Sequence, residues 1–263
     1  MGRMSKYASP AAIITHTRSG GTFLAACLSN HPDIFCPRGE PLLRGDAPER
    51  TAEWLRAFPS ASAIDVLRCI GAASFYKVGM CKITYPQATE EVLAHLKEVG
   101  ARIIHLTRKN VVRVAVSQYI TGAVVTGALP DHTEHTGRPV DPVSIVLQPG
   151  GFIERCRWLV EQQQKMTAAL AALGLPVLPL TYADMMDGEG HEGTELPQWL
   201  SHYICEFLGV ERRILGSHLR RVNHYPPSTL VSNWSQLREQ LELTEFQWCL
   251  DEEDKIEYRR SDS

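Results

Sequence analysis

Short apolar runs alternate along the chain with longer stretches in which apolar residues recur at helical spacing. The short runs are rich in aliphatic and β-branched residues, a composition typical of buried strands. They predict strands at residues 11–14, 76–83, 102–108 and 176–182. The longer stretches predict helices at residues 22–28, 48–71, 88–99, 110–122, 152–173 and 196–208. Together these elements predict an α/β fold in which helices flank a central sheet.

Residues 123–150 follow neither pattern. Glycine and proline recur through this stretch, and His132 and His135 lie within it without the cysteine or carboxylate partners of a metal site. Loops of this length in compact domains are usually functional lids or disordered segments. We therefore interpret 123–150 as a lid or flexible insertion within a single domain that spans residues 1–263.

The overall composition favours a globular enzyme and narrows the classes of partner. The 263 residues carry a formal net charge of −3, so no general attraction to nucleic acid is expected and any basic site must be local. Seven scattered cysteines without a Cys-x-x-Cys pair fit reduced thiols better than disulfides or a zinc site. No apolar run reaches membrane-spanning length and residues 1–10 contain no apolar signal core, so we expect a cytoplasmic protein without a membrane span.

The chain between the first predicted strand and the first predicted helix has the features of an anion-binding turn. Arg18, Ser19, Gly20 and Gly21 interrupt the apolar run, and helical spacing resumes at Thr22. The first amides of a helix lack internal partners and carry the positive end of its dipole, and glycines let the backbone approach a phosphate closely. An ordinary strand-to-helix turn could also contain two glycines, but an arginine directly before them favours anion binding.

Two motifs that this turn lacks narrow the nature of the anion. The P-loop of nucleoside triphosphatases would end in Gly-Lys-Ser or Gly-Lys-Thr, and this turn contains no lysine. The Gly-x-Gly-x-x-Gly fingerprint of dinucleotide sites is missing as well. We therefore do not expect the anion to be a γ-phosphate held on magnesium, and we expect no metal ion.

The octapeptide Thr-Arg-Ser-Gly-Gly-Thr-Phe-Leu at 17–24 resembles the 5′-phosphosulfate loop of sulfotransferases that use 3′-phosphoadenosine 5′-phosphosulfate (PAPS). The resemblance is to bacterial members with motifs similar to tyrosylprotein sulfotransferase. It implies a three-layer, P-loop-like fold with a central, mainly parallel sheet of about four to five strands. Gly21 stands where the family usually has serine or threonine, which removes one phosphate contact but keeps the backbone cradle. The cofactor contacts that the resemblance implies are Arg18, Ser19, Gly20, Gly21, Thr22 and Phe23.

A second stretch, residues 106–117, resembles the 3′-phosphate motif of the same family. The resemblance assigns Arg108, at a strand end, and Ser117, in the following helix, to the 3′-phosphate of PAPS. From the residues alone, Ser117 could instead bond back to carbonyls of its own helix. Tyr182 begins a Tyr-Ala-Asp-Met segment similar to the family's Tyr-Glu-Asp-Leu, which implies a cofactor contact, although a core aromatic at a strand end is an equal alternative.

Three other places carry candidate charged groups. His-Pro-Asp followed by Glu40, within residues 31–40, resembles a family segment that sets a carboxylate beside the sulfuryl group, which implies Glu40 as general base. The alternative is that Glu40 is an ordinary solvent-exposed glutamate in a loop, without a catalytic role. Lys82 lies on a predicted strand and could point at a substrate. We favour the alternative, in which its side chain extends along the surface and its ammonium reaches solvent. Arg220 and Arg221 are candidates for a basic loop over the nucleotide.

These motifs predict an enzyme that transfers a sulfuryl group from PAPS to a hydroxyl group, or less readily an amine, and releases 3′-phosphoadenosine 5′-phosphate (PAP). Glu40 would take the proton of the acceptor and Arg18 would stabilise the transition state. The acceptor would be a small molecule, a glycan or a peptide, and a homodimer is left open.

Two alternatives remain. One is a small-molecule kinase on a similar P-loop-like scaffold, which the missing loop lysine disfavours. The other is a non-catalytic nucleotide-binding module, which the presence of both Glu40 and Arg18 disfavours.

Overall fold

The structure is a computed structural model that describes residues 9–37, 42, 62–72, 75–127, 144–186, 194–219 and 226–250. The chain falls into two compact units, and each is described by itself: one is drawn from 1–107 and 165–220, the other from 108–164 and 221–263. Several predictions concern residues outside the described ranges, namely Glu40, Arg220, Arg221, most of the predicted helix at 48–71 and the middle of the predicted lid, 128–143.

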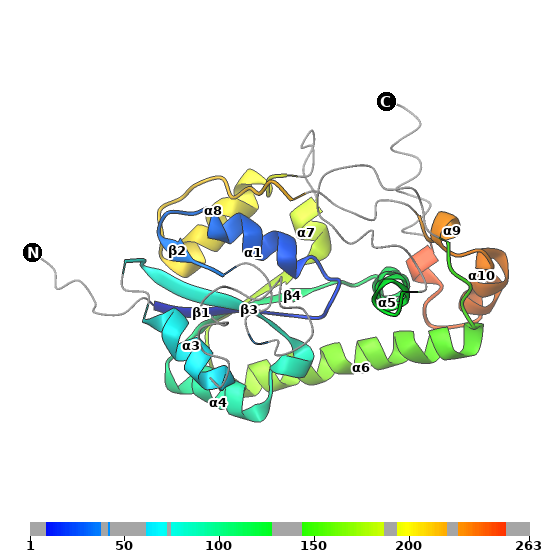
Figure 1. The fold of residues 1–263 in the computed structure, drawn as a ribbon, viewed down its shortest axis with the longest axis horizontal. Helices are drawn as coiled ribbons and strands as arrows, with labels where there is room; N and C mark the ends of the chain where they lie inside the picture. Colours follow the sequence, from blue (N-terminus) through cyan, green and yellow to red (C-terminus); the bar gives the residue numbers. More distant parts are fainter. Residues whose placement is uncertain are drawn as a thin grey trace, which may run out of the picture. The chain divides into compact units, whose positions relative to one another are not determined.

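The first unit is built on a five-stranded, all-parallel sheet with strand order β2-β3-β1-β4-β5 (Figure 1). The strands are β1 (Ser9–Thr15), β2 (Ile34–Phe35), β3 (Val78–Thr84), β4 (Arg102–Thr107) and β5 (Val177–Thr181). This confirms the predicted α/β fold class and the four predicted strands. Strand β2 was not predicted, because two residues are too short to show a pattern.

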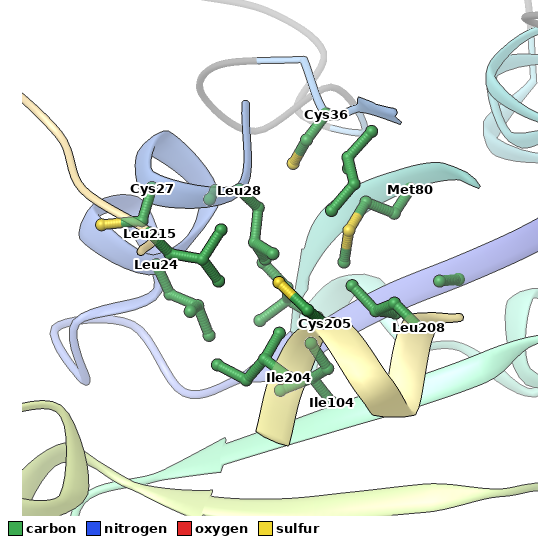
Figure 2. Close-up of a cluster of buried hydrophobic side chains, with 14 of the residues drawn as sticks. Leu24, Cys27, Leu28, Cys36, Met80, Ile104, Ile204, Cys205, Leu208 and Leu215 are labelled. Atoms are coloured by element: carbon green, nitrogen blue, oxygen red, sulfur yellow. The ribbon is translucent and has the colours of Figure 1, made fainter. Parts of the chain in front are cut away.

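Helices cover both faces of this sheet (Figure 1). One face packs against α1 (Gly21–Ser29) and α8 (Gln198–Leu208), and Figure 2 shows part of this core. The other face packs against α3 (Ala63–Gly71), α4 (Glu90–Glu98) and the last turns of α6 (Pro149–Leu173). Along β1, Ala11 and Ile13 face the first core while Ala12 and Ile14 face the second. Burial on both faces explains why β1 appears in the sequence as an unbroken apolar run.

Short elements and caps complete the first unit. Ser62 begins α3 with a capping box in which its side chain and that of Asp65 satisfy each other's backbone amides. Thr89 caps α4 by accepting a hydrogen bond from the Val92 amide. A 3₁₀ turn, η1 (Tyr85–Gln87), follows β3, and α7 (Tyr182–Met186) follows β5 directly.

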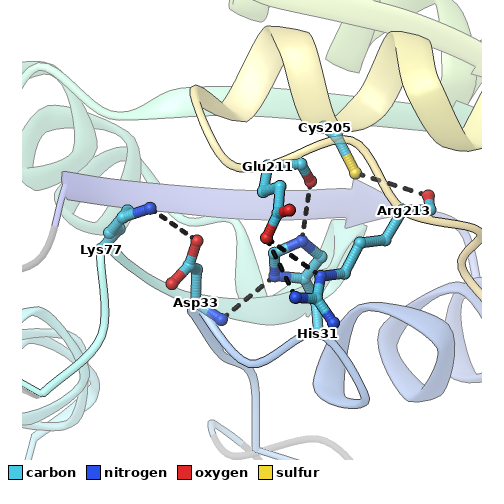
Figure 3. Close-up of polar contacts among 6 residues, drawn as sticks. All are labelled: His31, Asp33, Lys77, Cys205, Glu211 and Arg213. Atoms are coloured by element: carbon cyan, nitrogen blue, oxygen red, sulfur yellow. Dashed lines mark hydrogen bonds and ion pairs between the residues drawn. The ribbon is translucent and has the colours of Figure 1, made fainter.

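The His-Pro-Asp segment is a structural clasp at the end of α1 (Figure 3). His31 is 3% exposed; its Nε2 donates to the Glu211 carbonyl at 2.9 Å, and its Nδ1 accepts from the Asp33 amide at 3.1 Å. The Asp33 carbonyl accepts the Lys77 amide at 2.9 Å, and its carboxylate pairs with Lys77 Nζ at 2.7 Å. These bonds join the turn before β2 to the start of β3 and to the segment after α8.

The second unit is helical. It contains α5 (Val111–Val125), the first part of α6, α9 (Pro227–Leu230) and α10 (Trp234–Glu242), packed around a core that includes Phe152 and Leu237. Asn110 begins α5: its Oδ1 accepts from the Arg113 amide at 3.1 Å, and its Nδ2 donates to the Cys249 carbonyl at 2.9 Å. Both ends of the predicted lid are helical, because α5 extends to Val125 and α6 begins at Pro149.

The described residues just before α6 are held by hydrogen bonds to the segment before α10. The Ile145 amide donates to the Leu230 carbonyl at 2.9 Å, and the Ser232 amide donates to the Ile145 carbonyl at 2.9 Å. Asn233 brackets Leu147, since its Nδ2 donates to the Leu147 carbonyl at 2.7 Å and its Oδ1 accepts the Leu147 amide at 3.0 Å. The end of the predicted lid is therefore fixed within this unit.

The cysteines differ in exposure. All seven lie in the described residues, none forms a disulfide bond, and Cys69 is exposed while the other six are buried. Burial raises the pKa of the Cys36 thiol to about 12, which keeps it protonated at neutral pH. Across the described part of the chain, no helix has both the length and the apolar character needed to cross a bilayer.

Candidate functional site

The loop between β1 and α1 has an unusual backbone. Arg18 has φ 67°, and among the described residues it is the one non-glycine residue with positive φ. Gly20, which precedes the first residue of α1, has φ 88° and ψ 5°. A left-handed arginine costs on the order of 1–3 kcal/mol, and such strain persists only where surrounding contacts enforce it. The loop is therefore a built feature and a candidate for function.

The start of α1 presents donors to an incoming anion. Gly20 supplies no side-chain cap, and the first turn of α1 contains no acidic residue. The N-cap residue consequently offers no side-chain oxygen to the first amides of the helix, and these amides lie at the positive end of the helix dipole. Ser19 adds a hydroxyl: it is 1% exposed, and its Oγ has no hydrogen-bond partner within the described residues. A buried polar atom of this kind calls for a ligand oxygen or another polar partner.

Both glycines of the loop are required by packing. A Cβ on Gly20 would lie 2.6 Å from Met185 Cε and 2.8 Å from Tyr182 Cδ2. A Cβ on Gly21 would lie 2.7 Å from Thr15 Cγ2 and 3.1 Å from the Lys82 Cδ atom. The family's usual serine or threonine at the second position would therefore collide with Thr15. Glycine at position 21 is therefore consistent with the packing around Thr15.

Lys82, on β3, contacts the start of α1 beside this loop. Sequence reasoning did not predict this contact. Its side chain is buried, with the residue 4% exposed, and its Nζ donates to Thr22 Oγ1 at 2.9 Å. The favoured interpretation of a lysine reaching solvent is wrong. Strand alternation contains the missed signal, since Lys82 is in phase with Val78 and Met80, which face the core that contains α1. The structure thus brings a buried ammonium to the start of α1.

Tyr182 also lies against the loop. It is the first residue of α7, it is partly buried, and its ring limits the space above Gly20. Thr181 and Asp184 fix its position: the Thr181 amide donates to Asp184 Oδ2 at 2.7 Å, and the Asp184 amide donates to Thr181 Oγ1 at 3.2 Å. The ring therefore packs on the loop from the next strand end, and its contact with a cofactor stays a prediction.

The other predicted cofactor residues belong to the second unit. Arg108 follows the last residue of β4, and Ser117 is half-buried within α5. Arg113, 9% exposed, lies one turn before Ser117 on the same helix. Because the two units are described separately, the roles of Arg108 and Ser117 stay predictions. Glu40 lies outside the described residues.

A buried polar cluster lies beside the loop on the α3–α4 face of the sheet. His16 Nδ1 donates to the Thr17 carbonyl at 3.0 Å, and its ring meets Tyr85 edge-on at 5.3 Å. The Tyr85 hydroxyl and His105 Nε2 share a hydrogen bond at 2.8 Å. Burial lowers the pKa of His105 from 6.5 to about 4 and raises the pKa of Tyr85. Both groups are therefore uncharged at neutral pH.

The neutral state of His105 predicts acid sensitivity. Between pH 6.5 and about 4 the unfolded chain binds a proton at His105 that the folded chain does not, so stability falls by up to about 3 kcal/mol over this window. Urea unfolding at pH 7, 6 and 5 measures the free energy of unfolding, and His105→Gln should remove the part of its decrease that His105 causes. Tyr85→Phe should keep it, because burial rather than the hydrogen bond lowers the pKa. If the free energy of unfolding changed equally with pH in wild type and in His105→Gln, this assignment would be contradicted.

The collision at Gly21 predicts a rescuable defect. Gly21→Ala should lower the free energy of unfolding by about 1–3 kcal/mol through overpacking. Thr15→Ser removes the Cγ2 atom and keeps the hydroxyl that donates to the Leu106 carbonyl at 2.9 Å, so the double variant should regain part of the loss. Gly122→Ala is the control, since a Cβ there meets no atom within 4 Å. Simple additivity of the two changes in urea unfolding would argue against the contact.

Within the described residues, no group of three or more His, Cys, Asp or Glu side chains could hold a metal ion.

Comparisons with known proteins identify the fold. No protein-family model and no curated protein matches the sequence. Among solved structures, a sulfotransferase domain from the curacin biosynthetic pathway matches with TM-score 0.50 and 12% identity, over 90% of this chain and 99% of that chain. Mouse sulfotransferase SULT7A1 complexed with PAP matches with TM-score 0.40 and 14% identity, over 93% and 88%. The first likeness confirms the predicted resemblance at the level of structure: this chain has the α/β fold of a sulfotransferase domain.

Proposed function

We propose that the protein transfers a sulfuryl group from PAPS to a hydroxyl group, or less readily an amine, of an acceptor. One observation carries the proposal: the buried Ser19 hydroxyl lies without a partner among the described residues at an uncapped helix start, next to the left-handed Arg18 and near the buried Lys82. This combination suits a compact oxyanion group, because helix-start amides and a buried hydroxyl belong to one turn, which also contains Arg18 and is contacted by the Lys82 ammonium. The sulfotransferase fold supports the same assignment.

The loop would bind and polarise the 5′-phosphosulfate group. The amides at the start of α1 and the Ser19 hydroxyl would donate hydrogen bonds to its oxygens, and Thr22 would orient the Lys82 ammonium beside it. Arg18 and Lys82 would offset the charge that builds on the bridging oxygen as the S–O bond breaks. As in phosphoryl transfer, little covalent chemistry is required of the protein, so positioning and charge stabilisation dominate.

The remaining residues would hold the nucleotide and activate the acceptor. By resemblance, Arg108 and Ser117 would bind the 3′-phosphate, and Tyr182 would contact the nucleotide. Glu40 would accept the acceptor's proton as the new S–O or S–N bond forms. An ordinary glutamate, with a pKa of about 4.3, is a weak base at neutral pH, so we propose that the predicted lid, between its helical and hydrogen-bonded ends, excludes water from the site.

A binding measurement separates this proposal from its two alternatives. At a ligand concentration about 100 times the dissociation constant, PAP should stabilise the protein by about 2.7 kcal/mol. For a chain of this size that corresponds to a rise in Tm of about 5–10 °C, measured against buffer alone. A shift with ATP and magnesium but none with PAP would favour the kinase. A shift with PAP and no turnover with PAPS over a broad acceptor panel would favour the non-catalytic module.

A further inference from the structure

A second site candidate lies at the opposite end of the sheet from the loop. A cavity of about 510 Å³ opens beside Pro10 and Ala11 at the start of β1 and beside Gly79 near the start of β3. Lys82 and the loop lie at the other, carboxyl ends of these strands. Helices α3 and α4 supply the other walls, so the cavity belongs entirely to the first unit and is separate from the candidate sulfuryl-transfer site.

The walls of this cavity are mainly apolar. Leu67 and Ile70 line it from α3, and Leu96 and Val99 line it from the end of α4. The volume lies within the range of small-molecule sites, which are also predominantly apolar with a few placed polar groups. The cavity therefore suits the apolar part of a ligand.

Two basic side chains supply the polar groups of the cavity. His95 is 9% exposed, and its Nδ1 lies 3.4 Å from Glu98 Oε2. Arg68 has a largely exposed side chain, and its Nη1 lies 3.7 Å from Asp65 Oδ1, which is beyond hydrogen-bond distance. This ion pair is weak because it is exposed and long. Arg68 thus keeps the forked donor geometry with which arginine binds a carboxylate.

We propose that this cavity binds an amphipathic monocarboxylate, with its apolar tail between Leu67, Ile70 and Leu96 and its carboxylate at Arg68. The commitment to one negative charge follows from the lining, which contains one permanent cation and one histidine. The commitment to an apolar tail follows from the walls. No covalent step is involved, and the proposal is independent of the sulfuryl-transfer chemistry.

Isothermal titration calorimetry with decanoate on the full chain tests the proposal, and 1-decanol serves as the uncharged comparison. Gly71→Leu should fill the cavity: Gly71 lines it at the last residue of α3, and a Cβ there meets no atom within 4 Å. Gly122→Leu is the matched control, because its Cβ also meets open space but it does not line the cavity. Arg68→Met removes the charge and keeps an unbranched side chain.

Wild type and Gly122→Leu should bind one equivalent of decanoate with equal affinity, and Gly71→Leu should bind at least about tenfold more weakly. Arg68→Met should weaken decanoate binding by about tenfold and leave 1-decanol unchanged. Absence of decanoate binding by wild type would overturn the proposal, and so would equal affinities of wild type and Gly71→Leu. Unchanged decanoate affinity in Arg68→Met would overturn the assignment of the carboxylate. Thermal unfolding of each variant confirms that it is folded.

Discussion

Lys82→Met is expected to lower kcat/KM for sulfuryl transfer by about 10²–10³-fold, the usual effect of losing one preorganised charge donor at a developing anion. The side chain is buried, and its ammonium is held by Thr22 at 2.9 Å at the start of α1. Methionine keeps the unbranched stem that packs against Gly21. The expected loss is therefore electrostatic, and it should fall mainly on kcat if the ammonium acts on the transition state.

Stability provides the first control for this variant. Urea unfolding of Lys82→Met shows whether the variant is folded under the assay conditions, so that a loss of activity can be assigned to the missing ammonium. Lys77→Met, at an exposed residue directly before the same strand, is the matched control and should keep full activity. Activity of Lys82→Met within about threefold of wild type would remove Lys82 from the mechanism.

Glu40→Gln is expected to reduce turnover by about 10²–10⁴-fold, the contribution of a general base. Glutamine has nearly the same shape but cannot accept the acceptor's proton at neutral pH. Affinity for PAP should stay within about twofold of wild type, because the proposed base contacts the acceptor rather than the nucleotide. Steady-state kinetics with PAPS and thermal shift with PAP measure the two quantities separately.

An exposed glutamate supplies the control for the second variant. Glu239→Gln, at an exposed residue of α10 in the second unit, makes the same chemical change at a residue with no role in the proposed chemistry and should leave turnover unaltered. Unchanged turnover in Glu40→Gln would exclude Glu40 as the base. His16 would then be the next candidate, because it directly precedes the loop. Its Nδ1 donates to the Thr17 carbonyl, so Nε2 is the nitrogen that could accept a proton.

The regular elements of the first unit could be predicted because their patterns are local. Strand β1 is apolar on both faces, and α4 has a single apolar stripe between Thr89 and Gly100, so each pattern identifies its element. Strand β2 could not be predicted, since its two residues show no pattern of their own and become a strand through parallel pairing with Val78 and Gly79 of β3. Tertiary contacts, not propensity, create this strand.

The candidate site could be predicted only in part. The order Arg18-Ser19-Gly20-Gly21 indicated an anion site, but the left-handed Arg18 depends on the surrounding packing and has no sequence signal. The partnership of Lys82 with Thr22 joins residues 60 positions apart, so it requires the strand register to be known. To find this contact, the seven paired positions of β1 and β3 would have to be aligned, whereas the resemblance alone pointed to the loop.

The uneven exposure of the thiols makes one cysteine of the protein suitable for selective labelling. Cys69 lies on α3 between Arg68 and Ile70, both of which line the 510 Å³ cavity, while the other six cysteines are shielded. Maleimide reagents modify accessible thiolates far faster than buried thiols. A fluorophore could therefore be attached at Cys69 in the unaltered chain, where its emission would report on occupancy of the neighbouring hollow.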